Sequence, residues 1–184
     1  MNREQAFQLL KQNIQNQNLI KHCLAVEAIM RALAQKFGED EDKLGLTGLL
    51  HDIDYEKTKG EASHHSLVGA KMLEDLGLEK DIWQAVKVHN EAHGILPETL
   101  MEKALFVADP LTGLIVAAAL VLPSKELADL STENVLNRFK EKAFARGANR
   151  EIIKKSEEYL NLSLEEFVKI GLEAMQKIAR ELGL

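Results

Sequence analysis

Apolar residues recur along most of the chain at the three- and four-residue spacing of amphipathic helices. This spacing predicts helices over residues 3–15, 18–37, 41–51, 63–76, 79–93, 98–121, 132–145, 149–160 and 163–182. Start and stop signals support the assignment, because Asn2 precedes the first helix, Gly38 follows the second, and Ser163 and Glu166 form a capping-box sequence at the last. No segment shows the two-residue alternation of a half-buried strand. The pattern therefore predicts an all-α protein.

The longest apolar stretch, residues 104–122, approaches membrane-spanning length. Asp109 and Pro110 interrupt it, and a carboxylate in lipid is costly, so we expect a helix buried in the protein core. The N-terminal residues have no apolar run typical of a signal peptide. With no linker or repeat visible, we expect one soluble, cytoplasmic domain over residues 1–184, without a membrane partner.

Composition supports the helical prediction and limits the chemistry. Leu and Ala total 49 of 184 residues against 25 for Val, Ile and Thr, and β-branched residues are those that favour strands. A single cysteine, Cys23, excludes an internal disulfide and a thiolate cluster. The net charge of −6 argues against specific or non-specific nucleic-acid binding, although residues 138–155 alone carry seven Lys/Arg against two Glu.

The six histidines all lie between positions 22 and 93. Taken alone, His22 is typical of a hydrogen-bonded histidine at a core edge, and the adjacent His51 and Asp52 are typical of an ion-paired helix end. Asp109 is different, because a carboxylate within an apolar stretch is expected to be buried and then needs a cation or several donors. A metal ion would supply that cation.

The order His22, His51-Asp52, Asp109, set in the apolar segments HCLAVEAIM, GLLHDID and ALFVAD, resembles the HD-domain superfamily of metal-dependent phosphohydrolases. The resemblance spans about residues 18–122 and implies a compact helical bundle, to which residues 123–184 would add further helices. In the two-metal branch two more histidines follow the HD pair, and His65 and His89 are similar to them. The segment lengths are similar to those of dinucleoside polyphosphate hydrolases.

The resemblance implies one or two divalent transition metals (Mn, Fe, Co, Ni or Zn), consistent with imidazole and carboxylate donors. It implies metal-activated water that hydrolyses a phosphate ester or anhydride of a small nucleotide-like substrate. Asp52 would bridge the metals and act with His51 as the catalytic pair. The implied metal ligands are His22, His51, Asp52, His65, His89 and Asp109.

Phosphate also needs cations, and four basic residues are candidates for binding the substrate. Lys57 and Lys59 follow the HD pair closely, and Arg146 and Arg150 flank a predicted turn in the basic segment. The alternative is that this segment is a solvated helical face. Replacement of either arginine by alanine would distinguish the two, because loss of a phosphate contact raises KM.

Several alternatives remain open from the sequence. The chain has HDID where many relatives have HDIG, no GYP follows His93, and the neighbours His64 and His65 compete for one ligand position. His89 and His93 are spaced as in H-E-x-x-H metalloproteases, but Asn90 replaces the required Glu. A di-iron HD-fold oxygenase and a non-catalytic helical metal- or nucleotide-binding module are the rival functions. A homo-oligomer is left open.

Overall fold

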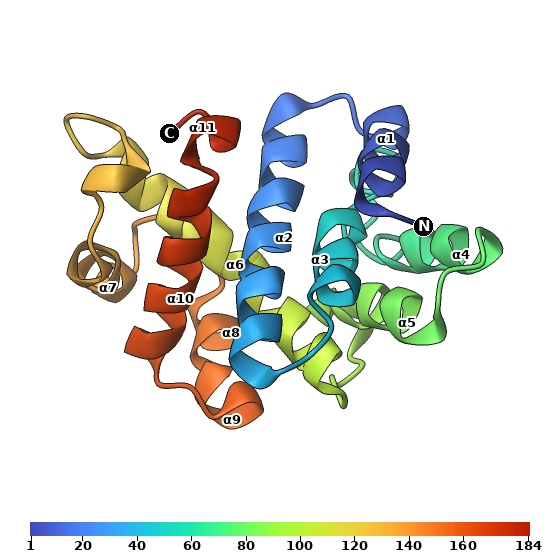
Figure 1. The fold of residues 1–184 in the computed structure, drawn as a ribbon. Coiled ribbons are helices and arrows are strands. Elements are labelled where there is room, and N and C mark those ends of the chain that lie inside the picture. Colours follow the sequence, from blue (N-terminus) through green and yellow to red (C-terminus); the bar gives the residue numbers. More distant parts are fainter.

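The computed structural model describes residues 1–184 and contains helices but no strand (Figure 1), which confirms the predicted all-α class. In chain order the α-helices are α1 (Arg3–Asn13), α2 (Gln17–Phe37), α3 (Glu41–Leu50), α4 (Leu67–Asp75), α5 (Lys80–Val88), α6 (Leu100–Leu120), α7 (Thr132–Lys140), α8 (Arg150–Lys154), α9 (Ser156–Leu160), α10 (Leu164–Lys177) and α11 (Ala179–Leu182). Two short 3₁₀ helices, η1 (Glu91–His93) and η2 (Leu127–Asp129), lie between them.

Helices α2 and α3 form a closely packed hairpin at the centre of the molecule (Figure 1). Helix α2 ends at Gly38, whose left-handed conformation (φ 73°) closes the helix as its sequence predicted. The buried Gly48 lets α3 approach α2, because a Cβ there would lie 3.0 Å from the backbone N and Cα atoms of Glu27. This close approach brings the end of α3 beside the middle of α2.

Helix α6 crosses the core and packs against α2, α5, α7 and α8. Its N-terminus has a complete capping box, in which Thr99 and Glu102 bond each other's backbone N–H groups. Helix α6 is long and apolar enough to cross a membrane, with a mean hydropathy of 1.7, but 61% of that apolar window is buried inside the protein. Pro110 lies inside the helix without ending it. The expected core helix is therefore present.

Three predicted helices are shorter in the structure than their sequence pattern indicated. The helix predicted from residue 63 begins only at Leu67, because Ser66 has a positive φ (70°), which a right-handed helix cannot include. The helix predicted to reach residue 93 ends at Val88, and the extended Asn90 separates it from η1. The helix predicted to reach residue 145 ends at Lys140.

The C-terminal helices are more broken than predicted. Helices α8 and α9 divide the predicted 149–160 helix, and Ile178 separates α10 from α11. At the start of α10, Ser163 accepts the predicted hydrogen bond from the backbone of Glu166, but the reciprocal side-chain bond is missing. The Glu166 carboxylate instead accepts from Lys36 Nζ at 2.5 Å, which ties α10 to the end of α2.

Candidate metal centre

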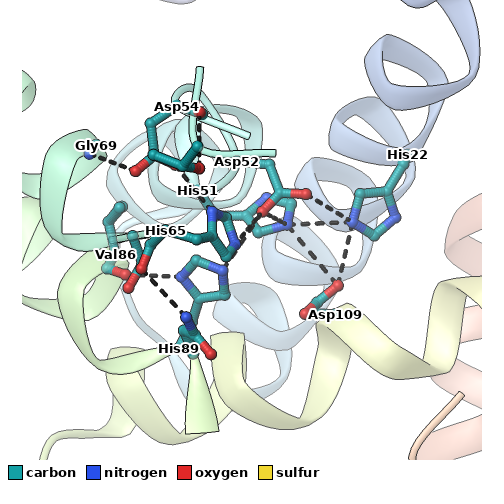
Figure 2. Close-up of polar contacts among 12 residues, drawn as sticks. His22, His51, Asp52, Asp54, His65, Gly69, Val86, His89 and Asp109 are labelled. Atoms are coloured by element: carbon teal, nitrogen blue, oxygen red, sulfur yellow. Dashed lines mark hydrogen bonds and ion pairs between the residues drawn. The ribbon is translucent and has the colours of Figure 1, made fainter. Parts of the chain in front are cut away.

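Six side chains from separate elements meet at one point of the bundle (Figure 2). Helix α2 contributes a histidine, the residues just after α3 contribute a histidine and an aspartate, and α6 contributes an aspartate. The turn before α4 and the end of α5 contribute one histidine each. These residues are His22, His51, Asp52, His65, His89 and Asp109, the set implied by the sequence resemblance.

Asp52 lies at the middle of this group. Its Oδ1 atom is 3.2 Å from Nε2 of His65, 3.4 Å from Nε2 of His89 and 3.4 Å from Nε2 of His51. Its Oδ2 atom faces His22, with 3.6 Å between Oδ2 and Nε2. One carboxylate thus faces the Nε2 atoms of four imidazoles, so it is placed to bridge two cations.

A second carboxylate completes one side of the group. Asp109 Oδ1 is 3.1 Å from His22 Nε2 and 3.8 Å from His51 Nε2. The two imidazole nitrogens are 3.1 Å apart. Three ligand-type atoms from α2, α3 and α6 therefore surround one small volume, and His51, Asp52 and His89 form a second such group.

The Nδ1 atoms of the histidines fix which nitrogen faces the centre. His51 Nδ1 donates to the carbonyl of Gly48 at 2.8 Å, and His89 Nδ1 donates to the carbonyl of Val86 at 2.7 Å. A carbonyl only accepts, so the proton sits on Nδ1 and the lone pair of each neutral ring is on Nε2. This arrangement is the usual support for a metal-binding histidine.

His22 is oriented by a similar contact on the opposite side of the centre. Its Nδ1 atom is 3.0 Å from Oγ1 of Thr112, and that hydroxyl donates its own proton to the carbonyl of Asp109 at 2.8 Å. The Thr112 oxygen must therefore accept from His22, which again directs Nε2 towards the centre. Thr112 was not identified from the sequence.

These contacts test whether the site fits a metal ion. With protons on both Nδ1 atoms, His22 and His51 would direct two lone pairs at each other across 3.1 Å, so a positive charge is needed between them. Ligands bound at about 2.1 Å and at right angles lie about 3 Å apart, which matches this separation. The donor set of imidazoles and carboxylates without thiolate suits divalent transition metals. The residues of this site therefore fit a divalent transition metal ion.

The pKa values reflect the same concentration of charge. Burial lowers the pKa of His51 to about 4, so this ring is neutral at pH 7. Burial opposes charge at His22 and at His65 too, but hydrogen bonds to Asp109 raise the pKa of His22, and bonds to Asp52 and Asp54 raise that of His65 to about 10. Without a metal, His65 is therefore protonated at pH 7, and a metal ion that binds this ring must displace one of its protons.

Exposure of the side chains differs across the centre. The His51 side chain is fully buried, whereas those of His65, His22 and Asp109 are 15%, 24% and 31% exposed. Asp109 is therefore less buried than its apolar sequence context predicted, because its carboxylate faces a cavity instead of the core. That cavity, of about 220 Å³, is also lined by His65, His89, Gly147 and Asn149.

Asp54 is a buried residue of the site that sequence reasoning missed. Its Oδ1 atom accepts from His65 Nδ1 at 3.0 Å, and its Oδ2 atom accepts from the backbone N–H of Gly69 at 2.7 Å. The side chain is fully buried, so both oxygens depend on these donors. The signal in the sequence was a second acidic residue in HDID, two positions after the HD pair. Asp54 is a positioning residue for His65.

We expect Asp54→Asn to weaken metal binding by about 10- to 100-fold, the range typical of lost support behind a metal-binding histidine. An asparagine has one acceptor oxygen, so its amide group must face the N–H of either His65 or Gly69. Metal titration followed by calorimetry measures the change, and the exposed Asp129→Asn serves as a charge-matched control. Unchanged affinity in Asp54→Asn would remove Asp54 from this role.

The two predicted lysines differ in their surroundings. Lys57 Nζ donates to the side chain of Asn13 at 2.7 Å, so it is engaged away from the centre. Lys59 lines a cavity of about 250 Å³ together with His65 and Asn90. The structure thus brings Lys59, but not Lys57, to the edge of the site.

The two predicted arginines also separate. The Arg150 guanidinium donates to the carbonyls of Phe139, Ala145, Ala148, Glu141 and Phe144, and its pattern of donors leaves none directed at the centre. Its surroundings give it a structural role in holding residues 139–148. Arg146 is exposed in that segment, next to Gly147 of the 220 Å³ cavity, and forms no ion pair.

We expect Arg150→Lys to lower the free energy of unfolding by about 1–3 kcal/mol, because a lysine cannot satisfy the carbonyls gathered around the guanidinium. Arg146→Ala should leave stability unchanged and raise KM for a phosphorylated substrate severalfold. Urea unfolding and steady-state kinetics measure the two effects. A rise in KM with Arg150→Lys at unchanged stability would contradict the assignment.

The remaining histidines lie outside the ligand group. His64 is exposed and contacts Glu61 at 2.5 Å, so His65, and not its neighbour, faces Asp52. His93 Nε2 lies 2.7 Å from the carbonyl of His65 and 3.0 Å from Ser66 Oγ, which holds the turn that carries His65. His89 and His93 do not share an α-helical face, so the spacing expected for a metalloprotease helix is absent.

Comparison with known proteins assigns the chain that forms this site to a family. The family model described as HD domain matches residues 19–114. The chain belongs to the HD-domain family. HD domains form a superfamily of metal-dependent phosphohydrolases that bind divalent metals, as the sequence resemblance indicated. No solved structure shows significant similarity to the chain.

Two kinds of curated relative are similar in sequence to part of this HD-domain protein. Ribonuclease Y of Nitratidesulfovibrio vulgaris is 33% identical over 142 residues, which cover 74% of this chain and 27% of that protein. The uncharacterized protein MJ0778 of Methanocaldococcus jannaschii is 37% identical over 107 residues, or 55% of this chain and 61% of that protein. The chain spans about a quarter of the length of the Ribonuclease Y relatives. The sequence predicted a small substrate and no nucleic-acid partner. The similarity to proteins named Ribonuclease Y does not support either expectation.

Proposed function

We propose that this HD-domain protein hydrolyses a phosphate ester or anhydride of a nucleotide with the help of one or two divalent transition metals. The observation that carries the proposal is the convergence of four imidazole Nε2 atoms and a second carboxylate around Asp52. A divalent metal in such a site supplies a water nucleophile at neutral pH and neutralises charge on phosphoryl oxygens.

The proposed roles follow from position. His22, His51 and Asp109 would hold one ion, His65 and His89 would hold the second, and Asp52 would bridge them. The buried His51 and His89 fix the inner side of the centre, while the partly exposed His22, His65 and Asp109 face the cavities through which a substrate reaches it. Manganese, iron, cobalt, nickel and zinc all suit these donors.

The cations proposed to bind phosphate lie around this opening. Lys59 shares a cavity with His65, and Arg146 is exposed beside the cavity that contains Asp109. In the hydrolysis, the oxygen of water forms a bond to phosphorus, the bond from phosphorus to the leaving oxygen breaks, and that oxygen takes up a proton. These two positive side chains would hold the phosphate group during this exchange.

A second candidate substrate is RNA. Two observations favour it: the similarity to Ribonuclease Y and the basic segment 138–155, part of which borders the cavity at Gly147 and Asn149. A single-stranded RNA would place one phosphodiester at the centre and its neighbouring phosphates against basic side chains.

The test combines metal analysis with a substrate panel. We expect the purified protein to bind one or two equivalents of manganese, cobalt, nickel, iron or zinc, and to hydrolyse nucleoside monophosphates, dinucleoside polyphosphates or short single-stranded RNA only when metal is present. Chelation followed by metal return is the control. Absence of bound metal together with no metal-dependent hydrolysis of any panel member would contradict the proposal.

A further inference from the structure

Three cavities that share lining residues adjoin one another at the edge of the metal centre. The first, of about 220 Å³, is the cavity that contains Asp109. The second, of about 250 Å³, shares His65 and Asn90 with the first. The third, of about 520 Å³, shares Tyr55 and Lys59 with the second. Because His65 borders both the first and the second cavity, a ligand bound at the centre can continue into the second.

Tyr55 is an aromatic residue where the second and third cavities meet. It is 40% exposed and does not pack against the hydrophobic core, whereas the other tyrosine, Tyr159, does. Its backbone N–H donates to the carbonyl of Asp52 at 2.9 Å, which fixes its place relative to the centre. Its ring lies edge to face with that of His65, with 5.2 Å between centroids and 82° between planes. Tyr55 is thus held beside a metal-ligand histidine while part of its surface stays open.

The amide group in the second cavity is already bonded within the protein. Asn90 Nδ2 donates to the carbonyls of Ala62 and His65 at 3.0 and 3.1 Å. Its Oδ1 atom accepts from the backbone N–H of Ala92 at 3.0 Å. Lys59, by contrast, is exposed and forms no ion pair. The cavity therefore offers a ligand an aromatic ring and a positive charge, and its amide is not free to bond the edge of that ligand.

We propose that Tyr55 stacks against the nucleobase of a substrate whose phosphate lies at the metal centre. This inference rests on the proposed function and names the residue that recognises the base. Aromatic side chains bind nucleobases by stacking with little preference among them, because every base has a π face. One ribose joins a base to its phosphate. A nucleotide with its base on Tyr55 therefore directs its phosphate to the His65 side of the centre, where Lys59 borders the same cavity.

The surroundings of Tyr55 suit a base better than the other cavity at the centre does. The 250 Å³ cavity has no carboxylate side chain among its lining residues. Glu56 borders the 520 Å³ cavity, but its carboxylate accepts from the backbone N–H groups of Gln15 and Asn16 at 3.0 and 2.7 Å. The 220 Å³ cavity contains Phe106, which is only 6% exposed and so offers little ring surface for stacking.

Binding of a nucleotide analogue that cannot be hydrolysed tests the role of Tyr55 without reliance on turnover. The probe is 2-aminopurine ribonucleoside 5′-phosphonate, in which carbon replaces the ester oxygen and whose fluorescence is quenched by stacking. It is titrated into the protein loaded with zinc, which has a filled d shell and does not quench fluorescence. Ribose 5-phosphonate, which has the same phosphonate and no base, is titrated calorimetrically as the control ligand.

We expect Tyr55→Ala to abolish the quenching and to weaken binding of the 2-aminopurine nucleotide about 5- to 100-fold, the range that base–aromatic stacking supplies. Tyr55→Phe keeps the ring and should retain both the affinity and the quenching. Leu76→Ala removes an exposed apolar side chain outside the three cavities and should behave as wild type. Ribose 5-phosphonate should bind the wild-type protein and Tyr55→Ala equally, because it has no base to stack.

The outcomes separate this inference from the proposed function. Nucleotide binding that depends on the Tyr55 ring supports the inference even if no phosphate ester is hydrolysed, in which case only the proposed function fails. Metal-dependent hydrolysis by the wild-type protein, together with equal nucleotide affinity in wild type and Tyr55→Ala, would overturn the inference alone. Equal weakening of both phosphonates by Tyr55→Ala would overturn it too, because the change would then act through the metal centre. Circular dichroism and zinc content establish that each variant is folded.

Discussion

Asp52→Asn is expected to lower metal-dependent hydrolysis by three orders of magnitude or more and to prevent stoichiometric metal binding. The carboxylate faces the Nε2 atoms of His51, His65 and His89 through one oxygen and that of His22 through the other. An asparagine retains the shape but presents an uncharged NH₂ group either to three of these nitrogens or to that of His22, and it cannot bridge cations. Loss of several kcal/mol of charge stabilisation corresponds to a rate loss on the order of 10³.

Three measurements read the effect of Asp52→Asn independently. Elemental analysis gives the metal content, kinetics give the rate, and the change in Tm on adding metal reports binding to the folded state. Metal at 100 times its Kd should stabilise the wild-type protein by about 2.7 kcal/mol and leave the variant unaffected. The exposed Asp129→Asn removes the same charge at a residue that lines none of the cavities containing ligand residues, and it should behave as wild type. Metal binding equal to that of the wild type would show that Asp52 is not a ligand.

Gly48→Leu is expected to destabilise the protein by about 3 kcal/mol or more, whereas Gly113→Leu should not. Gly48 faces the backbone of Glu27, where a Cβ would already lie 3.0 Å from the N and Cα atoms, and a helix backbone cannot move aside as a flexible side chain can. At Gly113 the same change meets open space. The smaller pair, Gly48→Ala and Gly113→Ala, gives the graded comparison, with Gly113→Ala stabilising by roughly 0.5–1 kcal/mol.

Urea unfolding of the four glycine variants measures this contrast. A loss of metal affinity in Gly48→Ala should accompany its lower stability, because Gly48 both sets the α2–α3 separation and accepts the hydrogen bond that orients His51. Equal stabilities for Gly48→Ala and Gly113→Ala would show that the two helices can separate freely, contrary to the packing at Glu27.

The helices that the sequence predicted best are those whose local signals agree with their burial. Helix α2 has a continuous apolar stripe and ends at a glycine in the left-handed conformation, so its bounds could be predicted closely. The helices around His65 and His89 were predicted too long, because their apolar spacing continues through Ser66 and Asn90, where the backbone leaves the helix. Spacing reports which face is apolar, and it does not report a single residue with a different backbone conformation.

Candidate ligands could be named from the sequence because histidine and aspartate in apolar helices are unusual and because the HD order matches a known family. The supporting groups could not. Thr112 and the carbonyls of Gly48 and Val86 have no distinctive sequence signal, since any residue has a carbonyl and the hydroxyl of Thr112 matters only where His22 lies beside it. Arg150 was predicted to bind phosphate, but its guanidinium donates to backbone carbonyls. The sequence shows the charge of a residue and does not show its hydrogen-bond partners.

The sequence by itself determined the all-α class, the family, and the candidate residues that meet at Asp52, with the neighbours His64 and His65 left competing for one position. These properties depend on residue type and on spacing along the chain, which the sequence contains directly. Only the tertiary structure decided that His65 faces the centre while His64 faces solvent, that Asp54 supports His65, and that Arg150 holds a loop. Each of these depends on where the chain turns and on contacts between residues far apart in sequence. Directions of side chains are set by packing, which no local pattern records.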